Sequence, residues 1–464
     1  MAAPVLEAKK LSVSYKRAGE PVLRDLNFEA YEGEFVLVAG PSGGGKSTLI
    51  HSLNGIIPHM YEAEVEGQIL YRGEDITDYS VSERARLLGT VMQNPDEQLI
   101  FETVEDELAF PLENMAVPQA EMQQRIDRVL EMIALPATAS PDVLSGGEKQ
   151  KLVAGSTLIM GQRVLLFDEV LANLDKEAAH DLLQRLSYLC QSEGYTVVFI
   201  EHRLDWVLPY ADRIYWVNLD EVRVFHDAAT FRPYWQQQLR AALAFDWPAV
   251  SVPEDADVLL EAIDLTYSVP GKEVLARTNF CLRRGERWVL TGANGSGKTS
   301  FLNLLAGLTK PTAGKVRQSY GRKERYKKIG VIMQDPNYQL FMSTVREEIA
   351  FQAVSEERVA ELIEALGLQG LEERHPQSLS EGQKRKVGVA AILAMDPEVL
   401  LFDEPSVGLD YDSLGQLLRE LKRMDERSRL TMLTITHDER AASFLGDRVI
   451  RIEQGQLDVD MRIG

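Results

Sequence analysis

The chain contains the same series of motifs twice, and this repeat constrains its fold more than any other feature. Residues 35–56, 91–110 and 143–175 align, in that order, with residues 288–308, 332–351 and 378–410. From Ser145 to Ser380 and beyond, the offset between the copies is a constant 235 residues, and the second copy is shortened before that serine. Since a repeated order of motifs indicates a duplicated structural unit, the sequence predicts two domains of one fold.

Composition between the copies predicts the boundaries. We expect the first domain to span residues 1–235 and the second 258–464, because residues 236–257, with the run FDWPAVSVPEDAD, are rich in proline and acidic residues and are typical of a linker. Apolar runs such as 164–167 and 196–200 predict buried strands that alternate with helices. That pattern favours an α/β domain with a largely parallel core sheet.

The first block of each copy carries a glycine-rich loop of the form G-x4-G-K-S/T, after an apolar strand and before a helical stretch. Such glycines let backbone N–H groups surround the β- and γ-phosphates, while the lysine bridges the phosphates and the hydroxyl ligates magnesium. One match arises by chance with a probability of roughly 1–2%, so two in the same context predict two nucleotide sites. The predicted residues are Gly40, Ser42, Gly43, Gly44, Gly45, Lys46, Ser47 and Thr48, and then Gly292, Asn294, Gly295, Ser296, Gly297, Lys298, Thr299 and Ser300.

The run VLLFDE, at residues 164–169 and 399–404, places two carboxylates at the end of a buried strand in each copy. Burying carboxylates is costly unless they meet a cation. We therefore expect Asp168 and Asp403 to hold magnesium through water. The adjacent Glu169 and Glu404 are expected to polarise the water that attacks the γ-phosphate.

A histidine follows another apolar strand in each copy, His202 in FIEHR and His437 in TITHDE. From that place it can reach the γ-phosphate. A single histidine is more often structural than catalytic, but two at equivalent positions favour a catalytic role.

The segments LSGGE and LSEGQ, which begin at Leu144 and Leu379, each precede a basic, helix-favouring stretch. Taken alone, a serine before a helix is an N-cap. Combined with the glycine-rich loop and the FDE strand, the segment resembles the signature motif of ATP-binding cassette (ABC) ATPases. The resemblance covers nearly the whole chain, twice over.

The resemblance implies two tandem cassettes, each with a mainly parallel core sheet, an antiparallel β subdomain and a helical signature subdomain. It implies ATP and Mg²⁺ as cofactors, and a head-to-tail pairing in which the signature of one copy completes the nucleotide site of the other. It also implies magnesium-ligating glutamines and adenine-stacking tyrosines, although an ordinary core tyrosine is the alternative. The residues added in this way are Tyr15, Gln93, Ser145, Gly146, Gly147, Tyr267, Gln334, Ser380 and Gly382, and Asp175 and Asp410 match a loop that crosses between cassettes.

The two copies differ within these motifs. Glu381 replaces a glycine of the second signature, and Val170 stands where the second copy has Pro405. Neither change removes a catalytic group. We therefore predict two competent sites, of which the one capped by Ser380 is the slower.

The segments after the two glutamines, QNPDEQL with TVEDELAF and QDPNYQL with TVREEIAF, resemble the ATPases of energy-coupling factor (ECF) importers of vitamins and metal ions. This implies two partners, a transmembrane coupling subunit and a membrane substrate-binding subunit. The fused form with EHR resembles importers of thiamine or its hydroxymethylpyrimidine (HMP) precursor. Candidate counter-charges for basic residues of the partner are Glu105, Asp106, Glu107, Glu347 and Glu348, with a solvated acidic helix face as the alternative.

Charge and composition narrow the choice of function. A net charge of −21 argues against a basic nucleic-acid-binding face and against adhesion to anionic lipid. Two cysteines are too few for a cysteine-ligated zinc or iron–sulfur module. Without a signal sequence or an apolar run that could span a bilayer, we expect a cytoplasmic protein, peripheral on the inner face of the membrane. The alternatives are a tandem sugar-importer ATPase and a soluble ABC protein that acts on ribosomes or DNA.

Overall fold

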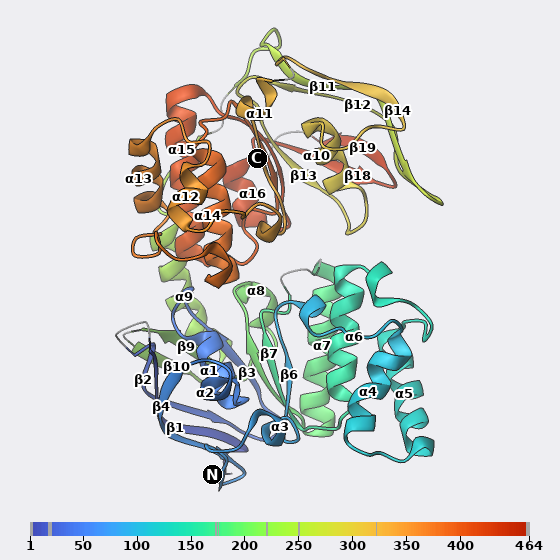
Figure 1. Ribbon diagram of the computed structural model, residues 1–464, viewed down its shortest axis with the longest axis vertical. Helices are drawn as coiled ribbons and strands as arrows, with labels where there is room; N and C mark the ends of the chain where they lie inside the picture. The colour runs from blue at the N-terminus through green and yellow to red at the C-terminus, as the bar shows by residue number, and fades with distance from the viewer. Residues whose placement is uncertain are drawn as a thin grey trace. The chain divides into compact units, whose positions relative to one another are not determined.

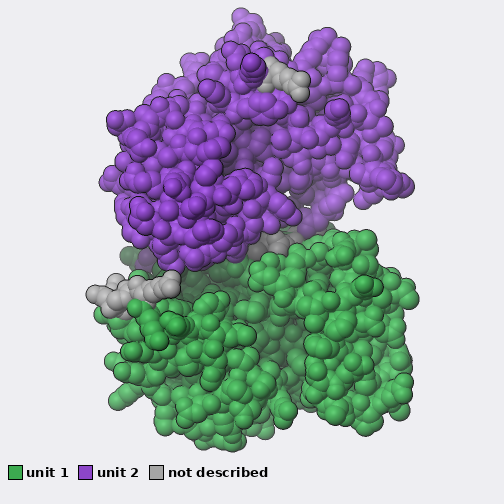
Figure 2. Space-filling model, viewed as in Figure 1, with its two compact units in different colours: residues 1–237 green, residues 238–464 purple. Residues whose placement is uncertain are grey.

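The protein is built from two units that repeat one α/β architecture. The computed structural model describes residues 3–16, 21–171, 174, 176–219, 221–248, 251–321 and 323–460. Residues 1–237 form unit 1 and residues 238–464 form unit 2 (Figure 2). The predicted α/β class with two tandem units is confirmed, and the same strand order recurs in both.

Each unit has a six-stranded core sheet, in the order β10-β9-β3-β8-β7-β6 in unit 1 and β19-β18-β13-β17-β16-β15 in unit 2. All neighbouring strands are parallel except the last hairpin, β9–β10 or β18–β19. In unit 1 the strands are β3 (Phe35–Ala39), β6 (Leu88–Val91), β7 (Val164–Asp168), β8 (Thr196–Ile200), β9 (Arg213–Asn218) and β10 (Glu221–Phe225). In unit 2 they are β13 (Arg287–Thr291), β15 (Ile329–Ile332), β16 (Val399–Asp403), β17 (Thr431–Ile435), β18 (Arg448–Glu453) and β19 (Gln456–Asp460).

A second, antiparallel sheet completes each unit. It has the order β2-β1-β4-β5 in unit 1 and β12-β11-β14 in unit 2. The strands are β1 (Leu6–Tyr15), β2 (Leu23–Ala30), β4 (Ala63–Tyr71) and β5 (Glu74–Asp75), then β11 (Val258–Val269), β12 (Lys272–Arg283) and β14 (Ala313–Gln318). Among the described residues, unit 2 has no counterpart of β5. That strand lies between the glycine-rich loop and the glutamine, where the sequence of unit 2 is shorter.

Helices surround the core sheets, and three of them form a helical subdomain in each unit: α4–α6 in unit 1 and α12–α14 in unit 2 (Figure 1). Unit 1 has α1 (Lys46–Leu53), α2 (Ile56–His59), α3 (Val81–Arg84), α4 (Val104–Asn114), α5 (Gln119–Ile133), α6 (Gly146–Leu158), α7 (Lys176–Glu193), α8 (Leu204–Val207) and α9 (Ala228–Ala242). Unit 2 has α10 (Lys298–Ala306), α11 (Arg325–Lys328), α12 (Val345–Ala350), α13 (Glu356–Ala365), α14 (Glu381–Leu393), α15 (Tyr411–Ser428) and α16 (Glu439–Leu445). No described helix combines the length and apolar character needed to cross a membrane.

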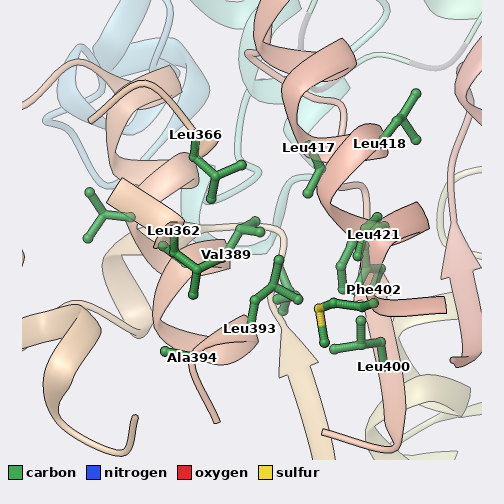
Figure 3. Close-up of a cluster of buried hydrophobic side chains, with 14 of the residues drawn as sticks. Leu362, Leu366, Val389, Leu393, Ala394, Leu400, Phe402, Leu417, Leu418 and Leu421 are labelled. Carbon is green, nitrogen blue, oxygen red and sulfur yellow. The ribbon is translucent and has the colours of Figure 1, made fainter. Parts of the chain in front are cut away.

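Apolar side chains hold the helical subdomain to the core sheet. In unit 2, Leu362 of α13, Leu393 of α14 and Leu417 of α15 belong to one buried cluster with Phe402 of β16 (Figure 3). Each fully buried side chain of this size contributes about 1.5–3 kcal/mol. The cluster therefore fixes α14, which begins with the second signature, against the strand that carries Asp403.

The segment between the repeats is more ordered than its composition predicts. Helix α9 includes residues 236–242, and the buried Trp247 belongs to the core of unit 2. Its indole Nε1 donates to Asp425 Oδ2 at 2.8 Å, and the Arg287 guanidinium lies 4.5 Å from its ring centroid. Burial of this large side chain, with its N–H hydrogen-bonded, stabilises a segment that its proline and acidic residues alone predict to be a linker.

The parallel strands bring the candidate site residues to one edge of each core sheet. Asp168 is paired with Ile200 across β7–β8, and Asp403 with Ile435 across β16–β17. The carboxyl ends of β3 and β13 lie beside these strands and continue into the glycine-rich loops. Ligands of open α/β sheets bind at this edge.

Candidate nucleotide sites

The two glycine-rich loops join β3 to α1 and β13 to α10. Gly45 and Gly297 precede the lysines with φ of 96° and 104°, and neither helix has a side-chain cap at its amino end. A residue with a Cβ avoids this left-handed region. Glycine therefore lets each helix begin directly at the lysine and present an uncapped amino end, which favours an anion.

Both loop lysines are buried and bound to the loop itself. Lys46 Nζ donates to the carbonyls of Gly40 and Pro41 at 3.0 and 2.8 Å. Lys298 Nζ donates to the two equivalent carbonyls at 2.8 and 3.0 Å. An ammonium held over the loop next to a helix amino end is placed to contact phosphate oxygens.

Close packing behind the loop explains its first glycine. A Cβ on Gly40 would lie 2.0 Å from the Val217 carbonyl oxygen, and one on Gly292 would lie 2.5 Å from that of Ile452. By contrast, a Cβ on Gly43 or Gly295 would meet no atom within 4 Å. The back of the loop is packed against the sheet edge, while its middle faces open space where a ligand can lie.

Oxygen donors suited to magnesium meet at the start of each loop helix. Thr299 Oγ1 donates to Asp403 Oδ2 at 2.7 Å, and Ser47 Oγ makes a longer contact of 3.4 Å with Asp168 Oδ1. Burial raises the pKa of both aspartates, and the charge of Glu169 raises that of Asp168 further. A cation at this point would relieve that cost.

These donors fit magnesium bound together with a nucleotide. Among the described residues no group of three or more His, Cys, Asp or Glu side chains could hold a metal alone. Magnesium typically uses one or two carboxylates and completes its shell with phosphate oxygens and water. In the second loop the buried Ser296 Oγ has no hydrogen-bond partner among the described residues, and a phosphate oxygen would satisfy it.

In unit 1 the predicted catalytic side chains lie together. His202 Nε2 is 2.9 Å from Glu169 Oε1, and Gln93 Nε2 donates to Glu169 Oε2 at 3.1 Å. Glu169 has φ of 50°, an uncommon conformation for a residue with a side chain, and its N–H donates to the Ile200 carbonyl. Strain of this kind is concentrated at functional sites.

Unit 2 repeats this arrangement with one change. Glu404 has φ of 53°, and His437 Nε2 lies 3.4 Å from Glu404 Oε1. Gln334 is held differently from Gln93, since its backbone carbonyl accepts a hydrogen bond from Arg385 Nη2. Arg385 is a residue that motif comparison missed.

The signature serines make only local hydrogen bonds among the described residues. Ser145 and Ser380 are the N-caps of α6 and α14, and Glu148 and Gln383 complete a capping box in each helix. These local bonds do not test whether Ser145, Gly146, Gly147, Ser380 and Gly382 complete a nucleotide site. Their role at a nucleotide remains a prediction.

The remaining predicted residues are placed as follows. Tyr15 lies at the end of β1, with its hydroxyl 3.1 Å from Thr48 Oγ1, whereas Tyr267 packs on the core of unit 2. Asp410 caps α15 by accepting from the Ser413 N–H at 2.7 Å. Asp175 lies outside the described residues. Ser42, Gly44, Asn294 and Ser300 lie in the two glycine-rich loops or at the start of α10.

Two glutamates that the sequence suggested as counter-charges have a structural role that the sequence did not predict. Glu107 Oε2 accepts from the Ile100 and Phe101 N–H groups at 2.9 and 3.0 Å. Glu348 Oε2 does the same for Phe341 and Met342. As counter-charges for a partner these two predictions are wrong, because both carboxylates are buried and bind backbone N–H groups. The sequence signal for this structural role was that both copies carry a glutamate at the same position.

Known proteins are similar to this chain in sequence. A family model described as ABC transporter matches residues 23–172 and 275–407, more than half of the chain. A Lactiplantibacillus plantarum (strain ATCC BAA-793 / NCIMB 8826 / WCFS1) protein named "Putative ABC transporter ATP-binding protein" is 33% identical over 526 residues, with 100% of this chain and 92% of that protein covered. The Bacillus subtilis (strain 168) protein named "Putative HMP/thiamine import ATP-binding protein YkoD" is 31% identical over 499 residues, with 98% and 91% covered.

A solved structure shows the same fold. The chain in "Model of ribosome-bound archaeal Pelota and ABCE1" superposes with a TM-score of 0.70 at 22% identity, covering 98% of this chain and 78% of that one. At this identity the likeness concerns the fold alone. Together with the matched family model and relatives, the two loops with their carboxylates lead to one conclusion: the chain belongs to the ABC transporter family and is an ATPase with two ABC domains in tandem.

Proposed function

We propose that this ATPase is the energy-coupling subunit of an ECF-type importer and drives uptake of a micronutrient through a transmembrane partner. The proposed cargo is thiamine or its HMP precursor. The cargo rests on the similarity to YkoD, whose name describes HMP/thiamine import. We further propose that the protein works at the inner face of the membrane, with no nucleic acid as a partner.

The observation that carries the proposal is a pair of exposed apolar side chains in the segment that follows each glutamine. The pairs are Ile100 and Phe110 in unit 1, and Phe341 and Phe351 in unit 2. Their exposed fractions are 66% and 37%, then 76% and 64%. Each residue of the second pair lies 241 positions after its counterpart in the first pair, which is also the separation of Gln93 and Gln334. Exposed apolar side chains that recur at equivalent places favour a protein-binding surface.

The buried glutamates support this use of the segment. Glu107 and Glu348 each hold the two N–H groups of the turn that presents the first residue of the pair. The turn is thus fixed before any partner binds, which lowers the entropy cost of association. Asp106 and Glu347 are exposed beside it and are the counter-charges we retain for a basic partner.

The proposed chemistry assigns one task to each group. Lys46 and Lys298 contact the β- and γ-phosphates. Magnesium would be held by the Ser47–Asp168 and Thr299–Asp403 pairs with Gln93 and Gln334, and it would supply positive charge to the phosphate oxygens. Glu169 and Glu404 orient the attacking water and accept its proton. His202 and His437 lie beside these carboxylates and donate toward the γ-phosphate.

Purification from detergent-solubilised membranes tests the partner. We expect a polytopic membrane protein to co-purify with the wild-type chain. Ile100→Asp with Phe341→Asp should abolish co-purification and keep ATPase activity, whereas Tyr188→Asp, at a residue 62% exposed on α7, should change neither. Ribosomes or DNA in place of a membrane protein would refute the proposal, and uptake of labelled thiamine and HMP tests the cargo separately.

A further inference from the structure

Arg385 connects the helix that begins with the second signature to two catalytic segments of its own unit. It lies on α14 with 7% exposed. Its Nη1 donates to the Glu404 carbonyl at 3.2 Å, and its Nη2 donates to the Gln334 carbonyl. One side chain thus binds the backbone of both residues whose side chains are expected to act on the γ-phosphate and magnesium.

Among the described residues, the equivalent position of unit 1 makes no such connection. The residue 235 positions earlier is Gln150, which is 1% exposed on α6, and its amide nitrogen and oxygen have no hydrogen-bond partner among the described residues. There the Gln93 side chain itself bonds to Glu169. The two units therefore hold equivalent segments by different means.

The chemistry of arginine suits this task. A guanidinium offers several N–H donors in a rigid fork, so two carbonyls can be bound with little loss of side-chain entropy. Hydrogen bonds from a charged donor are stronger than those between neutral groups. Carboxylates of Glu381, Asp335 and Asp403 act on the same cation, which offsets the cost of burying it.

The bond to Glu404 matters because of the backbone there. A residue with φ of 53° keeps that conformation only when its surroundings restrain it. The Glu404 N–H is bound to the Ile435 carbonyl at 2.9 Å, and Arg385 binds its carbonyl. Together these bonds fix both sides of the strained residue.

We propose that Arg385 is a positioning residue of the unit 2 site: from the signature helix it holds Glu404 and Gln334 in the geometry needed for hydrolysis. The proposal rests on the proposed roles of Glu404 and Gln334. It makes unit 2 dependent on a cation at a position where unit 1 has Gln150. A purely structural arginine would stabilise the fold without affecting turnover.

The test isolates the unit 2 carboxylate in a Glu169→Gln background. There, Arg385→Gln introduces the side chain that unit 1 tolerates at the equivalent position. We expect kcat to fall about tenfold, equivalent to about 1.4 kcal/mol, with KM for ATP within about twofold. Arg385→Lys should restore part of kcat, because a cation returns without the fork. Lys386→Gln is the matched control, since this next residue of α14 contacts Gln416 at 3.2 Å and should leave kcat unchanged.

Thermal unfolding of each variant separates positioning from folding. Unchanged kcat in a folded Arg385→Gln protein would overturn the proposal, as would a rise in KM alone or a loss of activity that matches the loss of folded protein. If Arg385→Gln does not fold, the same criteria apply to Arg385→Lys. A separate Glu404→Gln variant in the same background shows whether the proposed role of Glu404 itself fails.

Discussion

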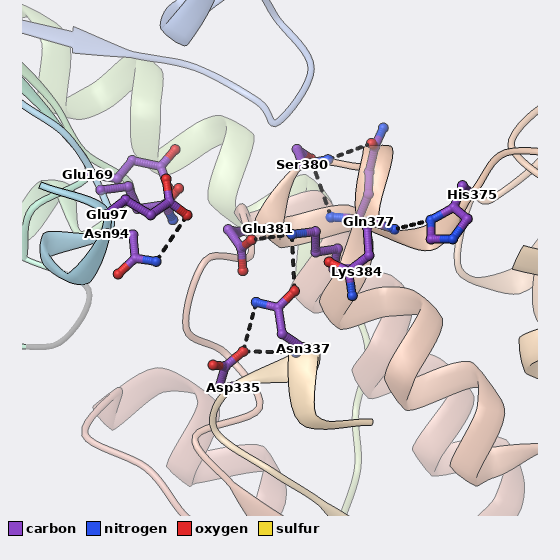
Figure 4. Close-up of polar contacts among 12 residues, drawn as sticks. Asn94, Glu97, Glu169, Asp335, Asn337, His375, Gln377, Ser380, Glu381 and Lys384 are labelled. Atoms are coloured by element: carbon purple, nitrogen blue, oxygen red, sulfur yellow. Dashed lines mark hydrogen bonds and ion pairs between the residues drawn. The ribbon is translucent and has the colours of Figure 1, made fainter. Parts of the chain in front are cut away.

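Each unit pairs a lysine of its signature helix with a carboxylate, but the carboxylate comes from a different element in each unit. In unit 1, Lys149 of α6 forms an ion pair of 2.5 Å with Asp96, three residues after Gln93. In unit 2, the equivalent Lys384 has Asn337 in place of that aspartate, at 3.1 Å, and binds Glu381 of its own helix at 2.8 Å (Figure 4). The acidic partner has moved from the glutamine segment to the signature.

This exchange changes how Glu381 is interpreted. As a substitution in the signature it suggests an uncompensated negative charge, whereas the structure shows it paired with a lysine that has lost another carboxylate. The effect of a residue that differs between the copies therefore depends on the side chains that contact it. We expect both sites to hydrolyse ATP, and the effect of Glu381 on turnover to be small.

The largest expected effect tests whether the units are functionally equal. Glu169→Gln and Glu404→Gln should each lower ATP turnover, and the double variant should lose at least about 100-fold, since each change removes the group that orients water. Steady-state phosphate release measures all three. Unchanged turnover in either single variant would break the comparison, because only one unit would then be hydrolysing.

A second prediction concerns Asp168 and Asp403. Because burial raises the pKa of both, their ionised forms destabilise the nucleotide-free fold at pH 7. Replacement by asparagine should abolish magnesium-dependent turnover but raise the free energy of unfolding, at Asp168 by at least about 1 kcal/mol. The gain should be larger at Asp168, where Glu169 adds to the repulsion and the contact to Ser47 is longer.

The pH dependence of the stability gain from asparagine is the control for this prediction. A raised carboxyl pKa means that the penalty is present at neutral pH and disappears as the pH falls and the carboxyl is protonated. The stability advantage of Asp168→Asn should therefore shrink from pH 7 toward pH 5 in urea titrations, because the pKa of Asp168 is raised to about 7. An advantage that is constant over this range, or a loss of stability, would contradict the assignment.

Sequence predicted the parts of each site that depend on local patterns. The glycine-rich loops, the FDE strands and the two histidines follow from residue types at fixed spacing, and the structure brings them to one sheet edge. Arg385 and Glu107 could not be predicted in this way. Arg385 binds carbonyls of residues that are 19 and 51 positions away in the sequence but adjacent in space. Glu107 binds the N–H groups of a turn whose path depends on tertiary packing. Spacing between motif residues does not reveal such hydrogen bonds.

A third prediction measures the exchanged ion pair directly. Glu381→Gln should lower the free energy of unfolding by about 0.5–1 kcal/mol, as for a partly exposed pair. In an Asn337→Asp background the same change should cost less, since Lys384 then has the aspartate that Lys149 has in unit 1. A double-mutant cycle on unfolding in denaturant gives the coupling. Additive effects would show that the two carboxylates do not share the lysine.

The last prediction concerns another place where the repeat differs. Glu398 of unit 2 binds Lys328 at 2.7 Å and Arg284 at 2.8 Å, which hold the pKa of its carboxyl at about 2, while unit 1 has Arg163 at the equivalent position. A lowered pKa means that this stabilisation is present above the ordinary glutamate pKa and is lost as the pH falls toward 2. Glu398→Gln should therefore cost about 1 kcal/mol at pH 7, and less below pH 4. The change in unfolding free energy caused by Arg163→Gln should not depend on pH in this range. Arg163 donates to a backbone carbonyl, which does not titrate.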